Sequence, residues 1–189
     1  MRRLTQEKVV MSELYVVFEY APISIILIGL LLSWNVPTAR WFLFSYAVVE
    51  TIDLMILPIS IQWNTHYYAF DILMALVFIL PIVYRREVAL FLYSKTGLEY
   101  FRIVYERQKL SAQECGIILI MALTCIVNFA TWVEVLSYKY DLVVNAPFKL
   151  YFRDNIILLL HIIMCGTILT YALKAQEREQ EFLQNETIE

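Results

Sequence analysis

The sequence predicts an all-α, polytopic integral membrane protein: a single bundle of about five transmembrane helices spanning residues 15–173. Hydrophobic residues make up 60% of the chain and the mean hydropathy is +0.62, more than the usual apolar share of soluble domains. Five apolar stretches have the length that a helix needs to cross about 30 Å of hydrocarbon. They cover residues 15–34, 41–62, 68–84, 115–137 and 155–173.

Helix signals near the ends of these stretches support the division. Residues 1–14 form a short N-terminal tail, and a turn that contains Pro37 separates the first two stretches, because proline interrupts helical hydrogen bonding. Ser111 and Glu114 have the capping-box spacing just before the fourth stretch. If the first stretch is re-entrant, four true crossings remain and the N-terminus changes side.

The segment 85–114, between the third and fourth stretches, predicts an amphipathic helical hairpin. Its apolar character breaks at residues 94–97, and charges of alternating sign then follow at helical spacing, which favours a short solvated helix. The tail 174–189 is acidic and helical in pattern. A cytosolic protein partner would dock on these two segments through the following side chains: Phe101, Arg102, Tyr105 and Phe182. Packing at the membrane surface is the alternative role for this hairpin.

The distribution of basic residues predicts the orientation. Arg85 and Arg86 follow the third stretch directly, and short loops rich in lysine and arginine stay on the cytoplasmic side. We therefore expect the 85–114 segment and the C-terminus in the cytoplasm of a bacterial inner or plasma membrane. Five crossings then place the N-terminal tail outside, although it also carries basic residues.

Two carboxylates interrupt the second stretch. Glu50 and Asp53 lie three residues apart, on one face of a helix, and a carboxylate at the bilayer centre costs about 2.5–3.5 kcal/mol on insertion scales. They must face the bundle interior or water, be protonated, or bind a cation. His161 in the fifth stretch would complete an ion or proton site with them. In the alternative interpretation these acids only hold helices together, through groups such as Asn128 and Thr131.

Three further acids lie near stretch ends: Glu19, Asp71 and Glu134. In an antiparallel five-helix arrangement these ends and His161 meet at one leaflet, which predicts a vestibule to the buried site. An interfacial anchor is the alternative role for each of the three.

Other classes of function find little support. The chain carries no phosphate-binding loop, no catalytic triad pattern and no paired-cysteine metal spacing, so no enzyme activity and no metal site is predicted. The net charge of −3 argues against direct binding of nucleic acid. No cofactor is predicted, and a bound cation is the one ligand that the buried acids suggest.

Two hypotheses of different class follow. The first is a cation or proton channel or transport subunit that forms a homo-oligomer in the lipid bilayer, because five helices alone make a narrow bundle. The second is a non-catalytic membrane anchor or sensor that recruits a cytosolic partner through 85–114 and 174–189. Small membrane subunits of bacterial multi-component systems, for example in phage defence, have a similar architecture.

Overall fold

The chain folds into a bundle of helices. The computed structural model describes residues 20–186, and within that range every regular element is helical, which confirms the predicted all-α class. Among these described residues, three helical segments are long and apolar enough to cross a membrane: Pro37–Val83, Ala112–Lys139 and Phe148–Leu173. The helix Tyr20–Leu32 is apolar but shorter. These segments are compatible with a membrane protein. The number of crossings and their orientation stay predictions.

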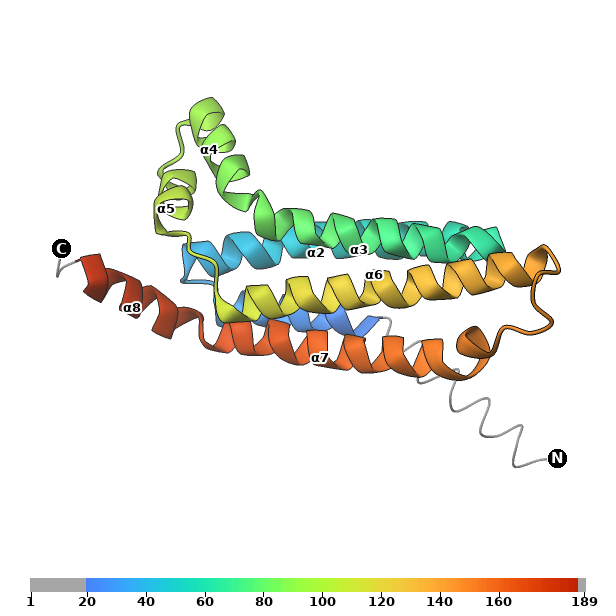
Figure 1. The fold of residues 1–189 in the computed structure, drawn as a ribbon. Coiled ribbons are helices and arrows are strands. Elements are labelled where there is room, and N and C mark those ends of the chain that lie inside the picture. Colours follow the sequence, from blue (N-terminus) through green and yellow to red (C-terminus); the bar gives the residue numbers. More distant parts are fainter. Residues whose placement is uncertain (1–19, 187–189) are drawn as a thin grey trace.

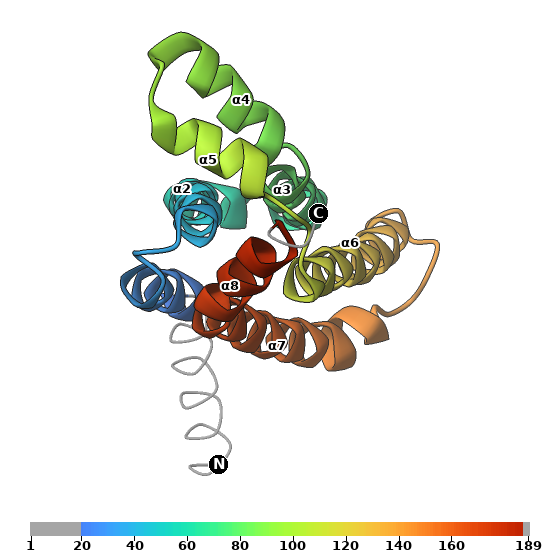
Figure 2. The same cartoon turned by 90° about the vertical axis from the view of Figure 1, so that its left-hand side faces the viewer.

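The segment Pro37–Val83 is itself a hairpin of two helices. α2 (Pro37–Ser60) begins directly after the turn at Ser33–Val36, with its proline in the first helical turn, where the missing N–H has no partner to lose. The chain reverses in the 3₁₀ segment η1 (Ile61–His66), where Asn64 leaves the helical conformation with φ 50° and ψ −100°. α3 (Tyr67–Val83) then runs back beside α2 (Figures 1 and 2).

A second, shorter hairpin projects from one end of the bundle. α4 (Arg85–Thr96) and α5 (Glu99–Arg107) are joined at Gly97, which takes the left-handed conformation at φ 67° that glycine adopts without steric cost. This bears out the predicted break at residues 94–97. In Figure 1 the hairpin turns away from the long axis of the bundle.

A buried ion pair fastens this hairpin to the next long helix. α6 (Ala112–Lys139) opens with the predicted capping box, in which Ser111 and Glu114 exchange side-chain to backbone hydrogen bonds. The other oxygen of the Glu114 carboxylate binds Arg85, whose guanidinium also donates to the Lys109 carbonyl oxygen. Arg85 and Glu114 are only 3% and 1% exposed. One carboxylate therefore caps α6 and holds the start of α4.

The last long apolar segment begins with a wide turn. The π-helix η2 (Phe148–Arg153) leads into α7 (Asp154–Leu173), and α8 (Ala175–Glu186) follows after a break at Lys174. α8 lies across the end of the bundle (Figure 2). It is tied to α5 by an ion pair of 2.7 Å between Arg107 and Glu179.

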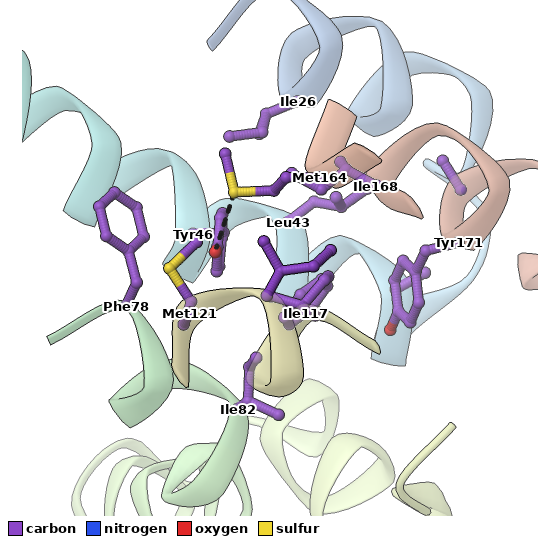
Figure 3. Close-up of a cluster of buried hydrophobic side chains, with 14 of the residues drawn as sticks. Ile26, Leu43, Tyr46, Phe78, Ile82, Ile117, Met121, Met164, Ile168 and Tyr171 are labelled. Carbon is purple, nitrogen blue, oxygen red and sulfur yellow. Dashed lines mark hydrogen bonds between the residues drawn. The ribbon is translucent and has the colours of Figure 1, made fainter. Parts of the chain in front are cut away.

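The core lies where the Tyr20–Leu32 helix meets the long helices. Figure 3 shows Ile26, Leu43 and Ile168 among the buried side chains of this cluster. The closest approach is at Gly29, where an added Cβ would lie 3.1 Å from the Cβ of Ala172 on α7. The described part of the first apolar stretch is thus an integral part of the bundle.

The outer surface of the bundle is apolar as well. Large exposed hydrophobic side chains occur on every long helix, among them Leu31, Met55, Leu76, Ile126 and Leu159. A soluble monomer rarely exposes apolar patches of this extent. The surface suits a hydrocarbon environment, in which apolar side chains need no cover.

Candidate functional site

A cavity of about 290 Å³, with mainly apolar walls and several ionisable groups, lies among α2, α3, α6 and α7. It brings together four acids or bases that the sequence analysis placed in an ion site or its vestibule. These are Glu50, Asp53, Asp71 and His161. The cavity is also lined by residues from α6 and from the start of α7, namely Thr124, Asn128, Arg153 and Asp154.

Glu50 is the most unusual of these residues. Its side chain is 5% exposed and makes no hydrogen bond or ion pair with any of residues 20–186. Tyr46, one helical turn earlier, directs its hydroxyl to the Met164 sulfur at 3.9 Å instead (Figure 3). A buried carboxylate without a partner is expensive, so this site has unused capacity for a positively charged or protonated group.

Arg153 organises the end of the cavity nearest η1. Its guanidinium donates to Asp71 at 2.8 Å, to the Asn128 side-chain oxygen at 3.2 and 3.3 Å, and to Asp154 at 3.1 Å. The same group stacks on the Tyr68 ring, 4.9 Å from its centroid. These contacts link α3, α6 and α7 in one network, in which Asp71 already has a cation.

Arg153 was not among the site residues predicted from the sequence. A charge balance could have found it. A carboxylate such as Asp71 inside an apolar bundle needs a cationic partner or a proton. Arg153 lies two residues before the last apolar stretch, so it is a candidate for that partner.

His161 faces the cavity with a fixed tautomer. Its Nδ1 lies 3.0 Å from the carbonyl oxygen of Ile157. A carbonyl only accepts hydrogen bonds, so Nδ1 carries the hydrogen. The Nε2 atom of the neutral ring is then an acceptor, which a proton or a donor group can use.

The polar groups of the cavity do not converge as metal ligands. Within the part of the chain that the structure describes, no group of three or more His, Cys, Asp or Glu side chains is placed to hold a metal ion. Glu50, Asp53 and His161 share a cavity without forming a coordination shell.

The remaining predicted vestibule residues lie elsewhere. Both carboxylate oxygens of Glu134 accept backbone N–H groups, from Phe148 at 2.9 Å and from Lys149 at 2.8 Å. Glu134 thus caps the helix that leads into α7, and it does not line the cavity. Glu19 lies outside the described residues.

The residues expected to dock a partner are partly engaged within the chain. Phe101 packs edge-on against Trp41 of α2, with ring centroids 5.5 Å apart, and Arg86 stacks on Tyr105 at 4.6 Å. Arg102 is half exposed and pairs with Glu99 of its own helix. Phe182 falls in α8, but its side chain is not among those that the structure describes. Docking of a cytosolic partner stays a prediction.

The charge balance of the cavity defines what it can do chemically. Glu50, Asp53, Asp71 and Asp154 face one arginine, so the fully ionised cavity would carry a formal excess of negative charge. Such a site attracts protons and cations and repels anions.

Comparisons with protein-family models, curated proteins and solved structures found no match. The function is therefore inferred from the residues of the cavity.

Proposed function

We propose that this chain is a membrane transport protein in which Glu50 binds and releases a proton or a small cation within the acidic cavity. The observation that carries this proposal is the state of Glu50, which is buried, lines the cavity and has no hydrogen-bond or ion-pair partner among residues 20–186. An ionisable residue inside an apolar bundle is a functional-site hypothesis by default.

A purely structural role explains Glu50 poorly. Polar groups that hold helices together do so through hydrogen bonds across the helix interface. Asp71 does this through Arg153, and Glu114 does it through Arg85. Glu50 makes no such contact with residues 20–186, so within this part of the chain it bears the cost of burial without a packing benefit. A bound proton or cation would neutralise it.

The neighbouring groups offer a route for ion movement. Asp53 and Glu50 line the cavity from α2, and His161 lines it from α7. Asp71 is paired with Arg153, so we assign this carboxylate a fixed structural role rather than a role in ion movement. In the proposed mechanism Glu50 and Asp53 carry the ion, and His161 supplies a second protonation site.

The cavity lies within one chain, so the proposed path runs through a single subunit rather than between subunits. Assembly into a homo-oligomer remains a separate prediction, which the mass of the detergent-solubilised protein tests. We further propose that the end carrying α4, α5 and α8 faces the cytoplasm, as the basic residues Arg85 and Arg86 indicate. Cysteines introduced on α4 should then react with impermeant reagents only from that side.

Proton flux in liposomes tests the transport proposal. The protein is reconstituted with a pH-sensitive dye inside the vesicles, and a potassium gradient with valinomycin drives proton entry. We expect Glu50→Gln to lower the flux by at least about tenfold, a change equivalent to 1.4 kcal/mol. Asp53→Asn should lower it as well. The matched control is Glu177→Gln, which removes an exposed carboxylate from α8.

Two results would overturn the proposal. The first is a wild-type protein that moves neither protons nor a small cation across the membrane faster than empty liposomes do, including when a cation gradient is present to exchange with protons. The second is a Glu50→Gln protein that is folded, monodisperse and as active as the wild type. Size-exclusion chromatography and circular dichroism of each variant establish that a loss of flux does not come from misfolding.

A further inference from the structure

The walls of the cavity around Glu50 are apolar and polarisable. Beyond its charged groups, the cavity is lined by two phenylalanine rings and three methionine side chains. They are Phe70, Phe78, Met74, Met121 and Met164. Behind this lining, the ring of the fully buried Tyr46 packs against Phe78, with the two ring centroids 5.1 Å apart (Figure 3). Aromatic faces attract cations, and methionine side chains pack adaptably around apolar groups.

This lining suits an inorganic cation poorly. Hard metal ions need about six oxygen ligands at short distance, and the described part of the chain offers no cluster of three acidic or histidine ligands. Asp71 is already paired with Arg153 at 2.8 Å. An ammonium group, in contrast, needs only one carboxylate as its counter-ion, and its apolar substituent suits apolar and aromatic walls.

The volume limits the size of the occupant. A cavity of about 290 Å³ lies at the lower end of the range of roughly 300–1,000 Å³ found for small-molecule sites. It accommodates an amine with a single ring or a short alkyl chain. A larger cation would have to displace side chains of the wall.

We propose that the cavity binds a small organic ammonium ion, with the charged nitrogen on the Glu50 carboxylate and the apolar body against Phe78, Met121 and Met164. This inference rests on the proposed function, because it names the class of cation that exchanges with the proton at Glu50. When the ammonium ion binds, the O–H bond of a protonated Glu50 breaks. One proton then leaves for each ammonium ion bound, and the charge of the cavity is unchanged.

Other ionisable groups face the same cavity. α2 contributes Asp53, and α3 contributes Asp71 together with Tyr67 at its first position. The start of α7 contributes Arg153, Asp154 and His161, whereas α6 contributes the neutral Thr124 and Asn128. Proton release on ammonium binding is therefore assigned to Glu50 only if the Glu50→Gln protein no longer releases a proton.

Isothermal titration calorimetry of the full chain in lipid nanodiscs tests the inference. The probe is 2-phenylethylammonium, and 2-phenylethanol and 3-phenylpropionate are its neutral and anionic counterparts. We expect the ammonium ion to bind at least about tenfold more tightly than the alcohol, since a charge-assisted hydrogen bond to the carboxylate is lost in the latter. Titration in buffers of different ionisation enthalpy should show proton release.

Substitutions at Glu50 sharpen the test. Glu50→Gln should bind the ammonium ion and the alcohol with similar affinity and release no proton. Glu50→Asp, which keeps the charge, should keep the preference for the ammonium ion. Equal affinity of the wild type for ammonium ion and alcohol, or an unchanged preference in a folded Glu50→Gln protein, would overturn the inference. If Glu50→Gln does not fold, the three probes on the wild type decide.

Ammonium binding and proton flux can fail independently, so the two proposals are tested separately. Glu50-dependent proton flux without ammonium binding would refute the organic cation and leave proton transport standing. Glu50-dependent ammonium binding without any flux would refute transport and leave a binding site.

Discussion

Replacement of Glu114 by glutamine should destabilise the protein strongly. The substitution removes the negative charge beside Arg85, and both side chains are almost fully buried. Removal of one partner of a buried ion pair costs about 3–5 kcal/mol, because the other charge is left without compensation. Glutamine still fits the third position of a capping box, so the hydrogen bond to Ser111 is kept and the loss reports on the ion pair.

Equilibrium unfolding in mixed micelles measures this effect. The purified protein is titrated with a denaturing detergent and followed by circular dichroism. A loss of about 3 kcal/mol corresponds to a change of roughly 150-fold in the unfolding equilibrium constant.

Ser111→Ala is the matched control, since it removes only the cap and should cost about 1 kcal/mol. A double replacement, Arg85→Met with Glu114→Leu, should recover most of the stability, because apolar side chains of similar volume often replace a buried pair at little cost. A Glu114→Gln protein no less stable than Ser111→Ala would refute the reasoning.

Three further predictions concern packing, capping and the tail. Gly29→Ala should lower the unfolding free energy by about 1–3 kcal/mol, because the added methyl group overpacks the helix contact. Gly166→Ala is the control, since its Cβ would meet nothing within 4 Å, and it should be neutral or stabilising. Equal effects of the two substitutions would contradict the tight helix contact at Gly29. Glu134→Ala should cost about 1–2 kcal/mol in the same assay, because two backbone donors lose their acceptor; an unchanged unfolding midpoint would argue against the cap. Arg107→Ala and Glu179→Ala should change global stability by less than about 1 kcal/mol yet speed amide exchange in α8, and unaltered exchange would show that the ion pair does not hold the tail.

Helix boundaries were predictable from the sequence because their causes are local. The pair Ser111 and Glu114 starts α6 and Gly97 ends α4, as expected. Pro37, which was expected in the turn before the second stretch, is instead the first residue of α2, a place that proline tolerates. Each of these signals acts through the backbone of its own turn. The hairpin of α4 and α5 could be predicted for the same reason.

The partners of the buried charges were harder to predict. Arg153 ends a π-helical segment, and such a wide turn rotates the following residues relative to a regular helix. A projection with a constant angle per residue cannot anticipate that rotation. The ion pair between Arg153 and Asp71 joins residues 82 positions apart, and no local pattern encodes it.

The amphipathic stripe of α5 illustrates a related limit. Its apolar face was predictable, but the sequence does not say what covers it. In the structure Phe101 packs against Trp41 of α2, so part of the face expected to bind a partner serves the hairpin itself. The sequence periodicity predicts an apolar helix face that must be buried. Only the tertiary structure shows which residues pack against it.

The unequal lengths of the long helices have a consequence for the surrounding lipid. At 1.5 Å per residue, the 17 residues of α3 span about 25 Å and the 28 residues of α6 span about 42 Å, against a hydrocarbon layer of about 30 Å. A short helix thins the bilayer beside it, and a long one tilts. Asp71 lies four residues after the start of α3, so thinning there should bring water and headgroups close to its pair with Arg153. We expect lipid chain length to control how readily ions reach the cavity, with short-chain bilayers giving the fastest access.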